Sequence, residues 1–186
     1  MSKIELIRGS SAEQNVDALV NAANNMLMSG GGICGVLFKK AGYIELTNAC
    51  KKYEVPLKDG DAVITPAFKI ENAKYIIQHT VGPNFGHTPN AFEELFKAYY
   101  NSLLVLKDNK LHSVSFPLIS SGIFGGNLQN PVKESVEQCI KAYKQFTKEY
   151  NDYEIQVKVC AFSSSEMIEA KNVFDRYFEY DRIYEE

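Results

Sequence analysis

The sequence predicts an α/β fold in which helices flank a largely parallel central sheet. Along the chain, apolar residues switch repeatedly between the alternation of a strand and the three-to-four spacing of a helix. Strands that alternate with helices favour parallel pairing, because each crossover helix returns the chain to the same edge of the sheet. The 186 residues contain no internal repeat and no Gly-, Ser- or Pro-rich linker. We therefore predict a single domain over residues 1–186.

Six short apolar runs are typical of strands, and longer amphipathic segments separate them. The strand-like runs lie at 3–7, 16–21, 61–68, 75–81, 113–119 and 153–162. The helical segments lie at 33–53, 91–109, 131–150 and 164–178. The first helical segment places Val36, Leu37, Lys40 and Ala41 at helical spacing, with Ile44 continuing the apolar side. The other three follow start signals, which are Pro89-Asn90, Asn130-Pro131 and a serine cap.

Composition restricts the classes of function. Apolar residues make up 45% and charged residues 23% of the chain, and the net charge is −3. This balance offers no broad attraction to nucleic acid or to a membrane surface, and no apolar run approaches the roughly 20 residues of a membrane span. The opening MSKIELIRG is typical of a strand rather than a signal peptide. Four scattered cysteines without a C-x-x-C pair favour free thiols, so we expect a cytoplasmic protein.

Two glycine-rich stretches, at 30–32 and 120–126, each follow a strand-like run. Glycine allows backbone N–H groups to approach a ligand without an intervening Cβ. The helix after the first stretch adds unpaired N–H groups and a positive dipole end, which suit a phosphate. Ligands of open α/β sheets usually bind at the carboxyl ends of the strands. We therefore expect both stretches to hold a phosphate-containing ligand at one edge of the sheet.

A dinucleotide-binding Rossmann unit is an alternative, since Gly30, Gly32 and Gly35 formally match G-x-G-x-x-G. The context argues against it. The residues AANNMLMS intervene between the strand and the glycines, and no acidic residue ends the next strand to hold a ribose. The chain also lacks the G-K-[ST] of phosphate-binding loops in nucleotide hydrolases.

Three motifs together resemble the macrodomain family, and its MacroD-like and viral hydrolase-type members in particular. They are VDALVNAANNMLMSGGGICGVLFKKAG (16–42), YIIQHTVGPNF (75–85) and FPLISSGIFGGN (116–127), in the family's order. The resemblance covers the chain to about residue 178 and leaves 179–186 as a short tail. It implies a three-layer α/β/α sandwich with a mostly parallel mixed sheet that binds ADP-ribose at its edge. Family members either recognise ADP-ribosylated proteins or hydrolyse ADP-ribosyl esters, including O-acetyl-ADP-ribose.

The resemblance also implies roles for particular residues. Asn24 would hydrogen-bond the distal ribose next to the scissile bond, donating and accepting at once, and it forms the reacting end of the site with Gly32 and Cys34. The remaining ligand-binding residues implied are Ser10, Ser11, Ala22, Gly30, Gly31, Ile33, Ser120, Ser121, Gly122, Ile123, Phe124, Gly125 and Phe162. Phe124 would lie against the distal ribose and Phe162 would flank the adenine. No metal or cofactor is implied, and we expect a monomer.

The chain departs from the family pattern at two places. Cys34 stands where many hydrolytic members have an aspartate that orients ribose and water. Ser10 and Ser11 replace an aspartate that accepts a hydrogen bond from the adenine amino group, so we expect looser adenine discrimination. We predict an ADP-ribosyl-ester hydrolase that acts on O-acetyl-ADP-ribose or on proteins modified at Asp or Glu. A non-catalytic reader of ADP-ribose is the alternative, and RNA or poly-ADP-ribose binding is disfavoured by the acidic net charge.

Two side chains allow a structural or a chemical interpretation. Cys34 near a helix N-terminus has the setting of a nucleophilic cysteine, but the sequence places no histidine beside it, so a pocket-lining role is favoured. His79 lies in an apolar strand and is interpreted as a core histidine rather than a metal ligand.

Overall fold

The computed structural model describes residues 1–87 and 89–185, and at 74–76, 123 and 179–185 it describes the backbone alone. The strands are β1 (Lys3–Arg8), β2 (Val16–Ala23), β3 (Ala62–Pro66), β4 (Ala73–Val81), β5 (Ser113–Phe116) and β6 (Gln156–Ala161). The helices are α1 (Gly32–Ala41), α2 (Tyr43–Cys50), α3 (Ala91–Asp108), α4 (Pro131–Glu149) and α5 (Ser164–Glu185). Two short 3-10 helices are η1 (Ser11–Glu13) and η2 (Ile123–Gly125).

The strands form one six-stranded sheet in the order β1-β6-β5-β2-β4-β3. All neighbours pair in parallel except β3, which pairs antiparallel with β4 at one edge of the sheet. The five parallel strands β1, β6, β5, β2 and β4 therefore all end on the same side of the sheet. We call this row of carboxyl ends the rim. The prediction of a mostly parallel mixed sheet is confirmed, and the rim is where such sheets place their ligands.

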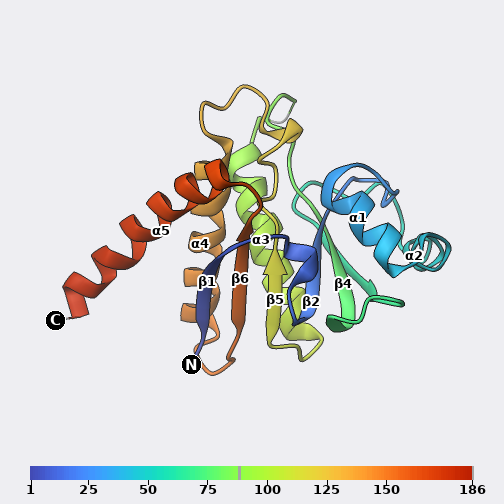
Figure 1. The fold of residues 1–186 in the computed structure, drawn as a ribbon, viewed down its shortest axis with the longest axis horizontal. Coiled ribbons are helices and arrows are strands. Elements are labelled where there is room, and N and C mark those ends of the chain that lie inside the picture. The colour runs from blue at the N-terminus through green and yellow to red at the C-terminus, as the bar shows by residue number, and fades with distance from the viewer. Residues whose placement is uncertain (88, 186) are drawn as a thin grey trace.

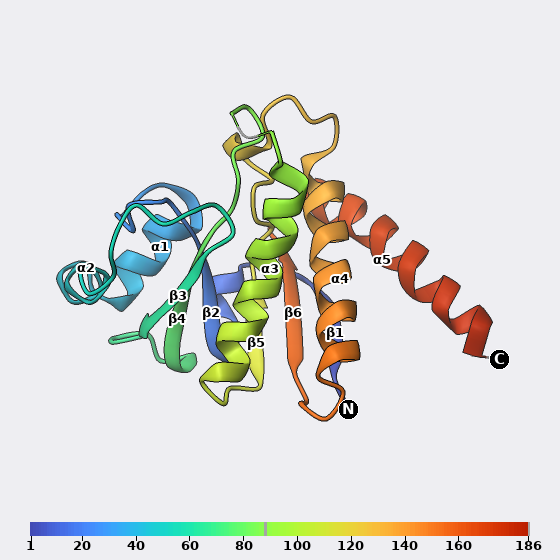
Figure 2. The same ribbon diagram turned by 180° about the vertical axis from the view of Figure 1, so that it is seen from behind.

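Helices cover both faces of the sheet. In Figure 1, α1 and α2 lie at the right beside β2 and β4, and Figure 2 shows α3 and α4 in front of the strands on the opposite face, with α5 beside α4. Two main cores follow from this arrangement. One joins α1 and α2 to the sheet through Leu19, Leu37, Phe38, Leu46 and Ile77. The other joins α3 and α4 to it through Tyr99, Leu103, Phe116, Phe146 and Val157. The three-layer sandwich implied by the family resemblance is present.

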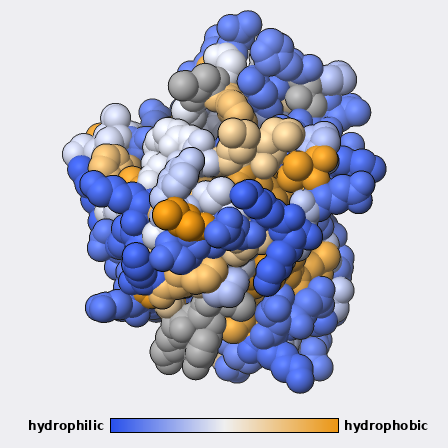
Figure 3. Space-filling view, turned by 90° about the vertical axis from the view of Figure 1, so that its right-hand side faces the viewer, coloured by the Kyte–Doolittle hydropathy of each residue, from blue (hydrophilic) through white to orange (hydrophobic). Residues whose placement is uncertain are grey.

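The single helix predicted over 33–53 is wrong, because the chain breaks at Gly42. Gly42 has φ +108°, a conformation that favours glycine. The Gly42 N–H donates to the Phe38 carbonyl at 3.1 Å, which is the last hydrogen bond of α1. The Gly42 carbonyl accepts the first hydrogen bond of α2, from the Leu46 N–H. The helical phase changes at the break, and Ile44 in α2 is 71% exposed rather than inward. Val36 is 43% exposed because α1 buries Leu37, Phe38 and Ala41 instead. Figure 3 views this side of the molecule, where hydrophobic side chains reach the surface among hydrophilic ones.

The last helix has the start signal that the sequence predicts. The Ser163 hydroxyl accepts from the Glu166 N–H at 3.2 Å, and the Glu166 carboxylate accepts from the Ser163 N–H at 3.2 Å. This reciprocal capping box satisfies two donors that would otherwise lack partners. The helix continues to Glu185, so the stretch predicted as a short tail at 179–186 is helical through residue 185. Among the residues described, no helix is both long and apolar enough to cross a bilayer.

Candidate functional site

The rim gathers segments that are far apart in the sequence. The first glycine loop (residues 24–32) follows β2, and the second glycine loop (residues 117–126) follows β5. Because β2 and β5 are neighbours in parallel, both loops leave the same edge of the sheet. Phe162 follows β6 and Ser10 follows β1, so they extend the same rim. The Gly9 N–H donates to the Ala161 carbonyl at 2.9 Å and joins these two neighbouring ends.

The Asn24 side chain shapes the first glycine loop. Its Oδ1 accepts from the N–H groups of Met26 at 3.1 Å and Met28 at 3.0 Å. Its Nδ2 donates to the Met28 carbonyl at 2.7 Å. An amide oxygen has two lone pairs and an amide nitrogen has two donors. Among the described residues, one N–H of the Asn24 amide has no partner and can serve a ligand. The expectation that Asn24 also accepts a hydrogen bond at the ribose stays a prediction.

Gly30 leaves open the space beside that amide. A Cβ at Gly30 would lie 3.8 Å from Asn24 Nδ2 and 4.0 Å from Cys34 Sγ. Gly31 is the N-cap of α1, Gly32 is its first residue with φ +58°, and Gly30, Gly31 and Gly32 are all exposed. The first N–H groups of a helix lack intrahelical partners. The N-terminus of α1 thus points free donors into the region next to Asn24.

Gly35 holds the glycine loop close to α1. A Cβ at this position would lie 2.5 Å from the Gly30 carbonyl oxygen, closer than side chains pack. The requirement for glycine here therefore comes from the backbone of the first glycine loop rather than from a dinucleotide. This explains the fourth glycine of the stretch.

Cys34 lies behind the first glycine loop, in the core formed by α1 and the sheet. It is 4% exposed, and its Sγ lies 3.5 Å from the Met28 carbonyl and 3.7 Å from Asn21 Nδ2. Burial raises the pKa of the Cys34 thiol, while donors at Asn21 and Gly30 act in the opposite direction. The thiol is protonated at neutral pH, which agrees with the preference against a nucleophile. The side chain is buried, and its expected place at the reacting end of the site stays a prediction.

The second glycine loop is fixed against the turn after β4. Ser120 has φ +59°, and its hydroxyl donates to the Pro83 carbonyl at 2.7 Å. The Ser121 hydroxyl donates to the Leu118 carbonyl at 2.7 Å, so both serine side chains bond to the protein's own backbone. The Phe85 N–H donates to the Phe124 carbonyl at 2.8 Å. These contacts hold the backbone of the loop in place at the rim.

The other expected ligand residues of this loop differ in exposure. Gly122 is exposed and Phe124 is 36% exposed, so the Phe124 ring is available to a ligand rather than folded into the core. Gly125 is buried, since a Cβ there would meet the Pro131 ring at 2.8 Å. Its expected contact with a ligand stays a prediction. The side chain of Ile123 lies outside the described residues.

Where β1 and β6 end, the residues expected at the adenine differ in exposure. Phe162 is 70% exposed and Ala22 is half-buried. The Ser10 hydroxyl accepts from the Ala12 N–H at 3.2 Å and caps η1. Ser11 is only 5% exposed. Of the two serines, Ser10 is therefore the one a ligand reaches, and its adenine role stays a prediction.

Both glycine loops are neutral. The stretches 22–38 and 116–130 contain no Lys, Arg, Asp or Glu. A diphosphate at the rim would meet backbone N–H groups and one helix N-terminus, with neither a cationic clamp nor a repelling carboxylate in these stretches. Within the part of the chain that the structure describes, no three His, Cys, Asp or Glu side chains converge as a metal site.

His79 is a core histidine, as predicted from its apolar strand. It is 0% exposed, and its two ring nitrogens lie 3.0 Å from Asn21 Nδ2 and 3.0 Å from Thr65 Oγ1. Burial lowers the pKa of His79 to about 4, so the ring is neutral at pH 7. Sequence reasoning missed Asn21. The only signal would have been a polar residue within the apolar run before Asn24.

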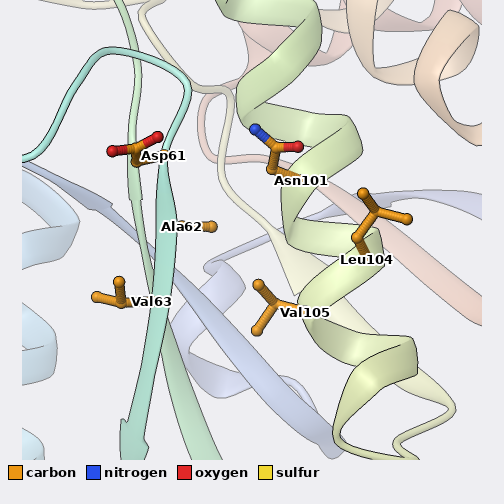
Figure 4. Close-up of a pocket in the computed structure, with 6 residues that line it drawn as sticks. All are labelled: Asp61, Ala62, Val63, Asn101, Leu104 and Val105. Atoms are coloured by element: carbon orange, nitrogen blue, oxygen red, sulfur yellow. The ribbon is translucent and has the colours of Figure 1, made fainter.

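A hollow of about 290 Å³ lies elsewhere, between β3 and α3. Figure 4 shows its lining side chains, Asp61, Ala62 and Val63 from the strand side and Asn101, Leu104 and Val105 from the helix. None of these residues belongs to a glycine loop. The hollow is therefore separate from the candidate site.

The fold and the rim define an α/β/α protein that presents two neutral, backbone-rich loops beside an asparagine. The Macro domain family model matches residues 20–134, and the chain belongs to this family. Among its relatives is the rat protein named ADP-ribose glycohydrolase MACROD1 (Rattus norvegicus), 37% identical over 162 residues. That match covers 86% of this chain and 60% of the relative, so the chain spans only part of that protein's length. A protein of Salmonella typhimurium named O-acetyl-ADP-ribose deacetylase is 39% identical over 153 residues, covering 80% of this chain and 82% of the relative.

Solved structures agree with this membership. The Oceanobacillus iheyensis macrodomain with ADP superimposes with a TM-score of 0.86 at 32% identity, covering 96% of this chain and 93% of the other. The Trypanosoma brucei macrodomain in complex with ADP-ribose gives 0.78 at 26% identity, covering 91% and 68%. This chain is thus similar over most of its length to macrodomains solved with ADP or ADP-ribose.

Proposed function

We propose that the chain hydrolyses ADP-ribosyl esters, either O-acetyl-ADP-ribose or proteins mono-ADP-ribosylated on Asp or Glu. The observation that carries this proposal is the free N–H of Asn24 beside Gly30, between two neutral loops at one rim. The names of the rat and Salmonella relatives support the reaction class. Four buried free cysteines support the cytoplasmic location that we propose, and we further propose that the enzyme is a monomer.

The diphosphate of the substrate would accept hydrogen bonds from the N-terminus of α1 and from the second glycine loop. Charge-assisted hydrogen bonds of this kind contribute roughly 1.5–3 kcal/mol each before ordering costs. Several of them replace the lysine or arginine that the two loops lack. Because the loops are already held by Gly35 and by the Ser120–Pro83 bond, little ordering is required when the ligand binds.

Hydrolysis requires a water held near the scissile bond and stabilisation of the charge that develops there. The Asn24 N–H would donate to a distal ribose hydroxyl and so fix the sugar. The water would lie between Asn24 and the substrate's own phosphate, which would also assist its deprotonation. Cys34 cannot serve as the base, since its thiol is buried and its pKa is raised.

A reader of ADP-ribose is the second candidate, and one observation favours it. The stretches 22–38 and 116–130 contain no Asp, Glu or His to act as a general base. A reader would use the same diphosphate and ribose contacts without turnover. The two functions therefore differ in one measurable quantity, the release of ADP-ribose.

A release assay separates the two candidates. The substrate is a protein mono-ADP-ribosylated on glutamate, incubated with wild type, Asn24→Asp or Asn25→Ala. The Asn24→Asp variant keeps an acceptor for the Met26 and Met28 N–H groups but removes the donor and adds a negative charge. We expect release by wild type and a loss of about a hundredfold in kcat in Asn24→Asp, the scale of one positioned donor.

Asn25 is the matched control within the same loop, because its side-chain amide donates to the Leu57 carbonyl at 2.7 Å and to Asp59 at 3.1 Å, both outside the glycine loops. Asn25→Ala should retain turnover. Wild type that binds ADP-ribose but releases none above buffer is a reader, which would reject the proposed hydrolysis. Undiminished release by Asn24→Asp would reject the role given to Asn24.

A further inference from the structure

A row of buried hydrogen bonds runs from β4 to the side chain of Asn24. Asn21 Nδ2 lies 3.0 Å from His79 Nδ1 and 3.7 Å from Cys34 Sγ. Cys34 Sγ lies 3.5 Å from the Met28 carbonyl, which also accepts from Asn24 Nδ2 at 2.7 Å. Asn21 and His79 are 0% exposed, so neither reaches a ligand at the rim.

The direction of each bond follows from the groups involved. The Asn21 amide nitrogen can only donate, so His79 Nδ1 is the acceptor and the ring proton sits on Nε2. That proton is donated to Thr65 Oγ1 at 3.0 Å. The second N–H of Asn21 points to the Cys34 sulfur, and the Cys34 thiol donates to the Met28 carbonyl.

The orientation of Asn21 depends on His79. Among the described residues, Asn21 Oδ1 has no hydrogen-bond partner. If the Asn21 amide were rotated by 180° while the His79 proton stayed on Nε2, Oδ1 would face the unprotonated Nδ1. Two acceptors would then face each other. The imidazole tautomer and the direction of the Asn21 donors are therefore coupled, and the ring proton on Nε2 goes with Asn21 Nδ2 facing Nδ1.

The far end of the row fixes Asn24. The Met28 carbonyl accepts from one N–H of the Asn24 amide, and the Met28 N–H donates to the Asn24 amide oxygen. The remaining Asn24 donor then points away from Met28, into the space that Gly30 leaves open. A shift of the Met28 peptide would turn this donor, although nothing at the rim itself had changed.

We propose that Asn21 and His79 are positioning residues that, through Cys34 and Met28, hold the ligand-facing N–H of Asn24 in its productive direction. This inference rests on the proposed hydrolysis. Binding of ADP-ribose depends on many backbone donors, whereas turnover depends on the direction of the single Asn24 N–H. Loss of the row should therefore affect kcat far more than the affinity for ADP-ribose.

Two substitutions of His79 distinguish an effect on the direction of the Asn24 N–H from an effect on core packing. In His79→Asn the side-chain amide lies near the place of Nδ1 and can accept from Asn21. In His79→Gln it lies near the place of Nε2 and retains only the Thr65 contact. Asn21→Leu removes both donors at similar volume. Cys50→Ala is the matched control, because Cys50 Sγ lies 3.8 Å from His79 Nε2 at the end remote from Asn24.

The experiment measures kcat for the ester, the Kd for ADP-ribose, the Tm, and hydrogen exchange at the Met28 amide. We expect kcat to fall about tenfold to a hundredfold in His79→Gln and Asn21→Leu, the scale of a small misplacement of a catalytic group. The Kd should change less than about threefold, well under the tenfold that ~1.4 kcal/mol would give. Exchange at Met28 should accelerate about tenfold, as expected when one hydrogen bond is weakened. His79→Asn and Cys50→Ala should stay close to wild type in kcat and exchange.

Several outcomes would overturn the proposal. One is unchanged kcat and exchange in folded His79→Gln and Asn21→Leu. Another is an equal loss of kcat in Cys50→Ala at equal Tm, which would assign the effect to packing. If wild type shows no turnover, the proposed hydrolysis fails instead. In that case hydrogen exchange at the Met28 amide is the remaining test of the positioning role. Equal exchange rates in His79→Gln and His79→Asn would reject that role.

Discussion

Asn24 combines two tasks in one side chain. Its oxygen and one N–H close the Met26–Met28 turn, which leaves a single directed donor for the ligand. The motif predicted that Asn24 would belong to the site, but it could not predict which of its atoms remain free. That depends on hydrogen bonds to a loop whose conformation includes Leu27 at φ +55°.

His79 makes the stability of the fold depend on pH. Its pKa is lowered by burial to about 4 in the folded protein, against an ordinary value near 6.5. Between these values the unfolded chain binds a proton that the folded chain does not, so the stability contributed by neutral His79 is complete above pH 6.5 and is lost as the pH falls toward 4. We expect wild type to lose about 2 kcal/mol more unfolding free energy than His79→Asn between about pH 7 and about pH 5.

Urea unfolding at both pH values measures this difference. His79→Asn keeps the acceptor for Asn21 but does not titrate, which makes it the appropriate reference. An identical pH dependence of the two proteins would show that His79 does not carry a lowered pKa.

At the scale of elements, α1 and the first glycine loop behave as one unit. Gly35 lies inside the helix, where alanine would ordinarily be more stable by about 1 kcal/mol. Here the added Cβ would lie 2.5 Å from the Gly30 carbonyl oxygen, so the loop must move. We expect Gly35→Ala to weaken ADP-ribose binding at least about tenfold, or ~1.4 kcal/mol.

Isothermal titration calorimetry measures this change. Val36→Ala is the control, since Val36 is the next residue of the same helix and its side chain is 43% exposed. That variant should bind as wild type does. Normal affinity in Gly35→Ala would mean that the position of Gly30 does not matter to the ligand.

Periodicity predicted the elements well where a single pattern continued, and poorly where backbone conformation interrupted it. Each of the six predicted apolar runs contains or overlaps a strand, and α3 and α4 lie within their predicted segments. The break at Gly42 was missed because apolar residues occur at helical spacing on both sides of it. Its cause is a positive φ, which hydrophobic spacing does not encode.

At the scale of the whole molecule, the order of the parallel strands creates the site. The sequence predicted two glycine-rich loops at one rim, and the pairing of β2 with β5 places them there. It did not predict the buried row behind them. Asn21 and His79 are 58 residues apart and meet only because β2 pairs with β4. Such contacts depend on strand register, which no local motif determines.

An NMR titration of the protein, uniformly labelled with the heavy nitrogen isotope, tests most directly whether the rim binds ADP-ribose. We predict saturable shifts that are largest at the backbone amides of Gly31, Gly32 and Gly122 and at the side-chain amide of Asn24. Amides beside the hollow between β3 and α3, such as Ala62, serve as the internal control and should shift little. Shifts confined to that hollow, or none at saturating ADP-ribose, would contradict an ADP-ribose site at the rim.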